Sequence, residues 1–421
     1  MVLVPRESDS ADLIRVRDLT TRFYTEEGQI NAVESINFTI QKGEIFGIVG
    51  ESGSGKSVAA LSLIDLIEEP GRIVGGEIWY RNPDLAEMVA DATPDAVDGA
   101  YVDILQLSEG GRHALRGSTF SMIFQDPMSS FNPSVTVGEQ IAEAVEVQRR
   151  ASANPRSTRA RTEDFSLVSF LLSSALPSRQ FVTPDSKDRA IELLEQVGIP
   201  DPAKRAEEYP YEYSGGMLQR AMIAQALAGE PEILIADEPT TALDVTIQSQ
   251  ILQLLSELQD ETGLSIVLIS HNLGVISRIC DRVGVMYAGE LIEKGDLSDI
   301  HQSSVHPYTQ GLLDSIPDFE HPESSLQPIP GNVPSLLDSE MGDGCYFADR
   351  CPKAMTTCRE KPPEFTVDGD DDHTVQCYLA REAYDPAKAL EDNIDSEEPD
   401  ATASTMNREQ LEHSPVEFDN E

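Results

Sequence analysis

The sequence has little positive charge and no long apolar run. It holds 31 lysine and arginine residues against 74 aspartate and glutamate residues, a formal net charge of −43, and only eight of its basic residues are lysine. A surface this acidic repels phosphate backbones, so nucleic acid is not expected as the main partner. No apolar run reaches the ~18 residues that a membrane-spanning helix needs. We therefore expect no membrane span in this chain.

The start of the chain also lacks the pattern of a secretion signal, because its first apolar residues give way at once to charged and polar ones. We expect a cytoplasmic protein. A length of 421 residues allows one large α/β unit and an extension. Residues 381–421 hold only 13 acidic and 3 basic residues, so most of the acidity belongs to the folded body. This acidic tail is poor in aromatic residues and is predicted to be disordered.

A glycine-rich stretch at residues 50–57 fits the pattern G-x-x-x-x-G-K-[ST]. It follows an apolar run at 45–49, which predicts a buried strand, and it precedes a segment with helical spacing. In this order, loop amides and a helix N-terminus point hydrogen-bond donors at phosphate oxygens. Lys56 is expected to reach the β- and γ-phosphates of ATP, and Ser57 to place its hydroxyl on Mg²⁺. The predicted ATP-binding residues are Gly50, Glu51, Ser52, Gly53, Ser54, Gly55, Lys56 and Ser57.

A second apolar run, at 233–236, ends in Asp237 and Glu238. A strand here would deliver two adjacent carboxylates to the phosphate end of the site. We expect Asp237 to hold Mg²⁺ and Glu238 to orient and deprotonate the attacking water. The alternative is an ordinary acidic strand end in an acidic protein, which the phosphate-binding stretch upstream makes the weaker interpretation.

A further motif, Ser214-Gly-Gly-Met-Leu-Gln219, lies between these two stretches. The three motifs together make the sequence resemble the ATP-binding subunits of ABC transporters over about residues 12–315. The resemblance implies an α/β P-loop ATPase of the ABC type. Such a domain has a mixed-sheet core, an antiparallel β subdomain and an α-helical subdomain, here at about 127–230. Tyr213 stands where leucine is usual, and Met217 where many members have glutamine.

The resemblance also implies further site residues. Ser214, Gly215 and Gly216 match the family signature. Gln125 matches the Q-loop, which senses the site and contributes to the Mg²⁺ site. Asp244 matches the D-loop, and His271 matches the switch histidine. Phe23 stands where the family stacks an aromatic ring on adenine, and the adjacent Tyr24 is its alternative.

In this family two ATPase domains face head to tail and sandwich two ATP molecules. Ser214 and Gly216 of one domain would then contact the γ-phosphate held by residues 50–57 of the other. The implied partners are two multi-span permease subunits, a second ATPase chain, more often a paralogue than an identical copy, and an extracellular solute-binding protein. The implied location is peripheral, on the cytoplasmic face of the membrane.

Several segments narrow the resemblance to the oligopeptide and dipeptide importer branch, which also includes nickel importers. They are Ser129-Ser-Phe-Asn-Pro133, Tyr209-Pro210, His306-Pro-Tyr-Thr309 and a C-terminal extension at 316–380. Uptake of di- or oligopeptides is the implied function, with nickel or another small solute as the alternative. A soluble ABC ATPase of DNA repair or translation is a more distant rival, because the chain has no heptad run and its charge disfavours nucleic acid.

Four of the five cysteines, Cys345, Cys351, Cys358 and Cys377, fall within this extension, while Cys280 stands in an apolar segment and is expected to be a buried small residue. Clustered thiols in a cytosolic protein suggest a metal before disulfides. Zinc and an iron–sulfur cluster both accept four thiolates. The loose spacing and the Cys351-Pro352 step favour a [4Fe–4S] cluster, which some importer subunits of this branch carry, over zinc or unligated thiols.

Two insertions interrupt the family pattern. Residues 82–100 are acidic, alanine-rich and poorly patterned, and are expected to form a surface insertion. Residues 149–185 begin with an arginine-rich stretch, which we interpret as a solvated loop before a site for lipid headgroups or an acidic partner. Its arginines are Arg149, Arg150, Arg156, Arg159 and Arg161.

The acidity of the folded body predicts adaptation to a salt-rich cytosol, where dissolved ions screen the mutual repulsion of surface carboxylates. The protein is therefore expected to melt at a higher temperature in molar KCl than in low KCl. Thermal melts across a KCl series measure this directly. Equal or greater stability at low salt would rule the adaptation out.

Overall fold

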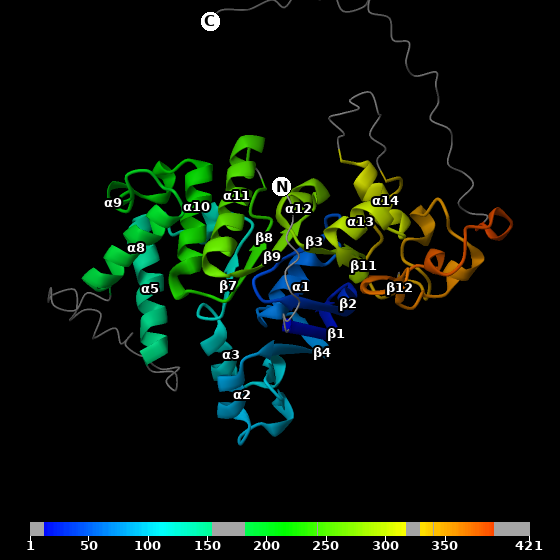
Figure 1. Ribbon diagram of the computed structural model, residues 1–421, viewed down its shortest axis with the longest axis horizontal. Helices are drawn as coiled ribbons and strands as arrows, with labels where there is room; N and C mark the ends of the chain where they lie inside the picture. Colours follow the sequence, from blue (N-terminus) through cyan, green and yellow to red (C-terminus); the bar gives the residue numbers. More distant parts are fainter. Residues whose placement is uncertain (1–11, 154–181, 242, 317–328, 340, 391–421) are drawn as a thin grey trace, which may run out of the picture.

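The computed structural model describes residues 12–153, 182–241, 243–316, 329–339 and 341–390. Over these residues the strands form an eight-stranded and a five-stranded sheet. Helices α5 (Val137–Ala153), α8 (Pro184–Gln196) and α10 (Gly215–Ala226) gather on one side of the strands, and the C-terminal segment, residues 341–390, lies on the opposite side (Figure 1). No helix of the described part is long and apolar enough to cross a membrane.

The eight-stranded sheet has the order β12-β13-β11-β10-β3-β9-β8-β7, and its strands from β10 to β7 run parallel to their neighbours. Strands β3, β8, β9 and β10 are buried along their whole length, which explains why their sequences are mostly apolar. The strand bounds are β3 (Ile45–Val49), β7 (Phe120–Ile123), β8 (Ile233–Asp237), β9 (Ser265–Ser270), β10 (Arg282–Tyr287), β11 (Glu290–Asp296), β12 (Phe365–Val367) and β13 (Asp370–Val375).

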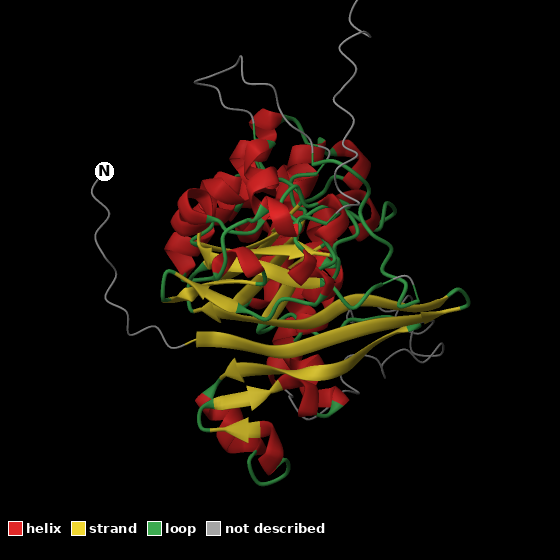
Figure 2. Cartoon of the chain, turned by 90° about the vertical axis from the view of Figure 1, so that its right-hand side faces the viewer, coloured by secondary structure: helices red, strands yellow, loops and turns green. Residues whose placement is uncertain are grey.

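The five-stranded sheet is antiparallel, in the order β2-β1-β4-β6-β5. Figure 2 shows its long strands lying beneath the larger sheet. Two of them are 14 residues long, where the sequence pattern predicts short strands, because register shifts and left-handed residues at Asp18 and Ser35 interrupt the alternation without ending the strands. The bounds are β1 (Asp12–Thr25), β2 (Gly28–Gln41), β4 (Gly71–Arg81), β5 (Val97–Asp98) and β6 (Tyr101–Asp103).

Strand β3 lies between two hydrophobic cores. Ile45 and Val49 belong to the core shared with the helices, whereas Phe46 and Ile48 belong to the core shared with the five-stranded sheet. The ring of Phe46 stacks on that of Phe38 in β2, with centroids 5.3 Å apart. Because alternate side chains of a strand point to opposite faces, both cores hold β3 in place. The loop that follows β3 therefore starts from a fixed point.

The sequence predicts helices over 187–197, 217–228 and 246–261, and the structure has α8, α10 and α11 (Val245–Thr262) there. Each helix begins one to three residues before its predicted start. In each case a side chain caps the helix, since Thr183, Ser214 and Asp244 accept backbone N–H hydrogen bonds from Ser186, Met217 and Ile247. The other helices of the sheet-facing layers are α1 (Lys56–Leu63), α12 (Leu273–Ile279), α13 (Leu297–Ser303) and α14 (Pro307–Asp314).

Residues 82–100 are more regular than their sequence indicates. They contain helix α2 (Pro83–Val89), a short 3-10 turn η1 (Pro94–Ala96) and strand β5, which extends the five-stranded sheet. The segment lies between β4 and β6, and it has regular structure although its sequence is poorly patterned. Asn82 supplies the local cause, because its side chain accepts the N–H of Leu85 and Pro83 occupies the first turn.

The beginning of the second insertion is also helical. Arg149 and Arg150 lie in α5, where Arg150 pairs with Glu146 at 2.8 Å and Arg149 approaches Asp185 at 3.5 Å. These two arginines thus interact with carboxylates of the helical region, and do not belong to a loop. Arg156, Arg159 and Arg161 lie outside the described residues. The remaining short helices are α3 (Glu109–Leu115), α4 (Pro127–Ser130), α9 (Pro202–Arg205), η2 (Ile104–Gln106), η3 (Pro210–Glu212) and η4 (Leu227–Gly229).

The C-terminal segment is continuous with the larger sheet. Strand β13 pairs with β11, where Glu293 faces Val375, and β12 then pairs with β13. Residues 381–390, which composition assigns to the acidic tail, pack against this segment, and Ala389 forms a bridge with Met355. The short turns of this segment are η5 (Ala348–Arg350), η6 (Thr356–Arg359), η7 (Tyr378–Ala380) and η8 (Pro386–Lys388).

Candidate ATP site

The loop at residues 50–57 joins β3 to α1, and neighbouring backbones close over it. A Cβ atom at Gly50 would collide with the carbonyl oxygen of Met286, and one at Gly55 with that of Ala32. Gly55 also has a φ of 98°, a left-handed conformation that favours glycine. Both glycines are thus required by close approach. This packing holds the loop next to the N-terminus of α1.

Lys56 lies across this loop and is buried. Its ammonium group donates hydrogen bonds to the carbonyl oxygens of Gly50 at 2.9 Å and Glu51 at 2.8 Å. An ammonium group has three donors, so one remains for a phosphate oxygen. Burial lowers the pKa of Lys56, although the nearby carboxylates of Glu238 and Asp237 oppose the shift.

Ser57 and Asp237 meet at the end of β8. The Ser57 hydroxyl donates a hydrogen bond of 3.1 Å to the Asp237 carboxylate. Burial raises the pKa of Asp237, and the bond from Ser57 only partly offsets the increase. A hydroxyl and a carboxylate oxygen are hard ligands of the kind that Mg²⁺ takes, with water and phosphate oxygens completing its shell. The pair therefore suits a Mg²⁺ ion that arrives with a nucleotide.

Glu238 is the centre of a polar cluster beside that pair. Its carboxylate accepts hydrogen bonds from Thr241 at 2.8 Å and Gln125 at 3.1 Å, and lies 3.1 Å from Nδ1 of His271. Burial alone would raise the pKa of Glu238, but the bonds from Thr241 and His271 outweigh it, and the pKa is lowered. The carboxylate is thus ionised, as a general base requires. Thr241 is a contact that the motifs did not single out.

The backbone of Glu238 is also unusual. Its φ of 47° is left-handed, which is costly for a residue with a side chain. Hydrogen bonds hold this conformation, from the N–H of Glu238 to Ile269 and from the N–H of Thr241 to the carbonyl of Glu238. The turn directs the carboxylate toward Gln125 and His271, which come from the ends of β7 and β9.

The signature residues lie on a separate surface. Ser214 and Gly215 are exposed at the N-terminus of α10, and Gly216 is half-buried, where an added Cβ atom would lie 2.7 Å from the side chain of Ile247. Asp244 caps the neighbouring helix α11. Among the described residues, no hydrogen bond joins the signature to residues 50–57. Within the described part of the chain, the two halves of the expected ATP contact are thus not joined to each other by a hydrogen bond.

The structure also shows the surroundings of the aromatic residues Phe23, Tyr24 and Tyr213. Phe23 is half-buried, with its ring edge against Gly71, whereas Tyr24 beside it is 47% exposed. Tyr213, at the usual leucine position, is buried and donates its hydroxyl to the carbonyl of Arg205 at 2.8 Å. Burial raises the pKa of Tyr213, so the hydroxyl remains a donor.

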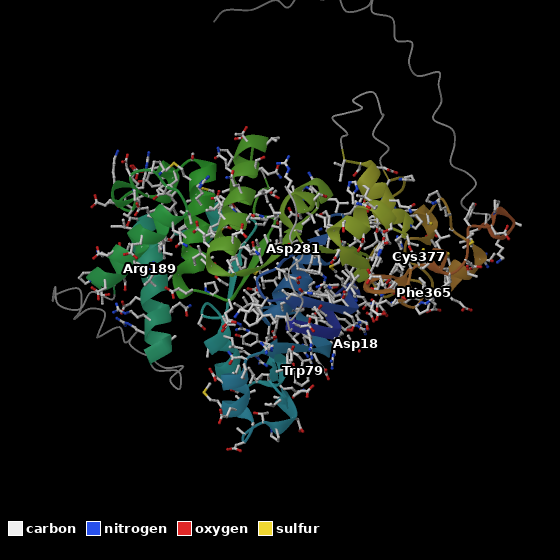
Figure 3. The ribbon with its side chains drawn as sticks, viewed as in Figure 1. Asp18, Trp79, Arg189, Asp281, Phe365 and Cys377 are labelled. Carbon is white, nitrogen blue, oxygen red and sulfur yellow. The ribbon has the colours of Figure 1, made fainter. Side chains whose placement is uncertain are left out.

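The four clustered cysteines surround one cavity. It is lined by Cys345, Cys351, Cys358 and Cys377, together with His306 and Phe347. Cys377 lies in the C-terminal segment near Phe365 (Figure 3). None of the described cysteines forms a disulfide. Burial raises the pKa of Cys345, Cys351 and Cys377 to about 12.

No group of three or more His, Cys, Asp or Glu side chains in the described part is arranged so that it could hold a metal ion. The four thiols line the cavity described above. Cys280 is separate from them, and burial raises its pKa. It packs in the core against β3, where a Cβ atom at Gly47 would lie 3.0 Å from its sulfur.

A glycine-rich phosphate loop at residues 50–57, an Asp–Glu pair at the end of β8 and a separate signature helix define an ABC-type P-loop ATPase. The comparisons with known proteins agree. Residues 33–241 match the ABC transporter family, and residues 292–358 match the C-terminal region of oligopeptide/dipeptide transporters.

The full-length relatives place the chain more closely. It is 43% identical over 372 residues to a probable peptide ABC transporter ATP-binding protein, y4tR, of Sinorhizobium fredii, covering 88% of this chain and 96% of that protein. It is 41% identical over 368 residues to the dipeptide transport ATP-binding protein DppD of Bacillus subtilis, covering 87% and 94%. With DppD of Escherichia coli the identity is 40% over 358 residues, covering 85% and 94%. The chain belongs to the ATP-binding subunits of oligopeptide/dipeptide ABC transporters, and it is an ATPase.

Replacing Glu238 with glutamine keeps the size of the side chain and a hydrogen-bond acceptor for Thr241, but removes the base. We expect Glu238→Gln to lower the turnover of ATP by about 10²–10⁴-fold, to leave ATP binding in place and to accumulate as a closed dimer. Turnover, equilibrium ATP binding and size-exclusion chromatography with ATP measure the three effects. Glu257→Gln, on the exposed face of α11, is the matched control. Undiminished turnover in Glu238→Gln would refute the assignment.

Proposed function

We propose that this chain energises the uptake of di- or oligopeptides through a membrane transporter by hydrolysing ATP. The observation that carries the proposal is the combination, in one chain, of an assembled ATP site with the C-terminal region of oligopeptide/dipeptide transporters. The similar proteins are named for peptide or dipeptide transport, which favours peptides over nickel or another small solute. The acidic surface disfavours a role in DNA repair or translation.

We propose the following roles for the site residues. Lys56 binds the β- and γ-phosphates of ATP, and Ser57 with Asp237 holds the Mg²⁺ ion. Glu238 accepts a proton from the attacking water, while Gln125 and His271 orient the Glu238 carboxylate and report on the nucleotide. Adenine stacks on Phe23, or on the more exposed Tyr24. Support comes from the hydrogen bonds that join these side chains at the ends of β3, β7, β8 and β9.

The exposed signature at the start of α10 fits a site that is completed by a second ATPase subunit. Ser214 and Gly216 of that subunit would contact the γ-phosphate, and Asp244 would lie at the same interface. ATP then favours the closed pair and hydrolysis releases it. The further partners are two permease subunits and an extracellular solute-binding protein, with this chain on the cytoplasmic face of the membrane. A paralogue is the proposed second ATPase.

A pull-down tests the transport role. Tagged Glu238→Gln protein, purified with ATP from gently solubilised membranes, is expected to bring two multi-span proteins, a second ATPase and a solute-binding protein that releases peptide on elution. Lys56→Ala, which weakens ATP binding, serves as the control and should bring less of the second ATPase. Ribosomal or DNA-bound partners from the soluble fraction would leave the ATPase assignment standing and contradict the transport role.

The cysteine cavity is proposed to hold a [4Fe–4S] cluster. The described part contains no group already gathered to hold a metal ion. The support for a cluster is the donor set, because all four thiols line one cavity and thiolates are the ligands of iron–sulfur clusters. Cys345, Cys351, Cys358 and Cys377 would be its ligands. When bound, the cluster would cross-link a segment with little core of its own.

Anaerobic purification tests the cluster. We expect a brown protein that contains about four iron and four sulfide per chain, and we expect Cys358→Ser to lose iron while Cys280→Ser retains it. Absorbance near the visible–ultraviolet border and analysis of iron, sulfide and zinc provide the measurement. A colourless protein with stoichiometric zinc would overturn the proposal.

A further inference from the structure

Glu51, the second residue of the phosphate loop, is held from the other end of the chain. The guanidinium of Arg350 donates to both carboxylate oxygens of Glu51, at 2.7 Å and 3.0 Å, across 299 positions of sequence. Such a two-pronged pair fixes orientation as well as distance. The Arg350 side chain is 5% exposed and that of Glu51 28%, so the C-terminal segment meets the loop in a largely dry contact.

The guanidinium is itself fixed by its surroundings. Its Nε donates to the carbonyl of Pro330 at 2.7 Å, and Nη1 lies 3.3 Å from the hydroxyl of Tyr287. The aliphatic part of Arg350 passes 3.1 Å from where a Cβ of Gly331 would stand, so a larger residue at 331 would press on it. Arg350 therefore has little freedom to leave Glu51.

A second contact joins the same segments. The backbone N–H of Glu51 donates to the hydroxyl of Tyr308 at 2.8 Å. The Tyr308 ring packs against Tyr287 and Phe347, with centroids 4.6 Å and 5.4 Å away, and all three rings are almost fully buried. Phe347 belongs to the C-terminal segment, three residues before Arg350. Both the backbone and the side chain of Glu51 are thus anchored to one packed unit.

The charge of Glu51 gives this anchor a consequence for ATP. A carboxylate on a phosphate-binding loop adds negative potential where the phosphates of ATP must enter, and a guanidinium in direct contact neutralises it. The carbonyl of Glu51 also accepts a hydrogen bond from Lys56 at 2.8 Å. A displaced Glu51 would therefore disturb the lysine that reaches the phosphates.

We propose that Arg350 is a positioning residue for ATP binding, through which the C-terminal segment neutralises Glu51 and keeps the phosphate loop in its binding conformation. Preorganising a loop raises affinity because its ordering cost is met before the ligand arrives. The proposal rests on the loop binding ATP. It is independent of the transported solute and of what occupies the cysteine cavity.

The experiment measures ATP affinity and steady-state turnover with the isolated full-length chain. Arg350→Met leaves the Glu51 charge uncompensated and is expected to raise the Kd for ATP about tenfold, with a much smaller change in kcat. Arg350→Lys keeps the charge but loses the two-pronged geometry, and is expected to raise the Kd about threefold. Adding Glu51→Gln to Arg350→Met removes the uncompensated charge and should restore part of the affinity.

The matched control is Lys294→Met. Lys294 joins β11 to the C-terminal segment through Glu364, at 2.7 Å, and makes no hydrogen bond to residues 50–57 within the described part of the chain. It should lower the melting temperature without changing the Kd for ATP by more than about twofold. Unchanged ATP affinity in both Arg350→Met and Arg350→Lys would overturn the proposal, as would additive effects of Arg350→Met and Glu51→Gln. If Arg350→Met does not fold, the Kd of Arg350→Lys for ATP is sufficient to test the proposal.

Discussion

The parallel arrangement of β10, β3, β9, β8 and β7 is the constraint on which the rest of the structure depends. Parallel strands end at the same edge of a sheet, so the loop after β3, the carboxylates after β8 and the histidine after β9 meet there although they are far apart in sequence. Alternate side chains of β3 fill two different cores, so a shift in its register would disrupt the packing of both. The hydrogen bonds between Ser57 and Asp237, and around Glu238, are therefore made between rigidly held ends.

In the proposed function, that edge provides only part of the ATP site. Lys56, Ser57 and Asp237 are assembled within the chain, whereas Ser214 and Gly215 are exposed at the start of a helix in the helical region. The cap that Ser214 provides to α10 leaves the helix N-terminus facing outward, where it can meet an anion from another molecule. In the proposed function, a site divided in this way would respond to ATP by bringing two surfaces together, which is what coupling of hydrolysis to movement requires.

Local patterns were sufficient to predict the phosphate loop, the strand that carries Asp237, and the main helices to within a few residues. Local patterns did not predict features that depend on contacts between residues far apart in the sequence. Nothing near Glu51 indicates that Arg350 will pair with it, since the two are 299 positions apart. Helix α2 was missed because the capping contribution of Asn82 outweighs weak apolar patterning. The pairing of β13 with β11, and the contact between Thr241 and Glu238, likewise depend on the assembled fold.

The chain has few basic residues, and the positions of several of them indicate a structural role. With 31 lysines and arginines in the whole chain, several are nevertheless buried in pairs with carboxylates, including Arg350 with Glu51 and Arg282 with Glu44. The excess of carboxylates is left to the surface, where dissolved salt screens their repulsion, whereas pairs removed from water are screened much less. Dissolved salt therefore acts chiefly on the repulsion between exposed carboxylates. The ion pair between Arg350 and Glu51 is largely removed from water, so its geometry should depend less on dissolved salt than the repulsion between surface carboxylates does.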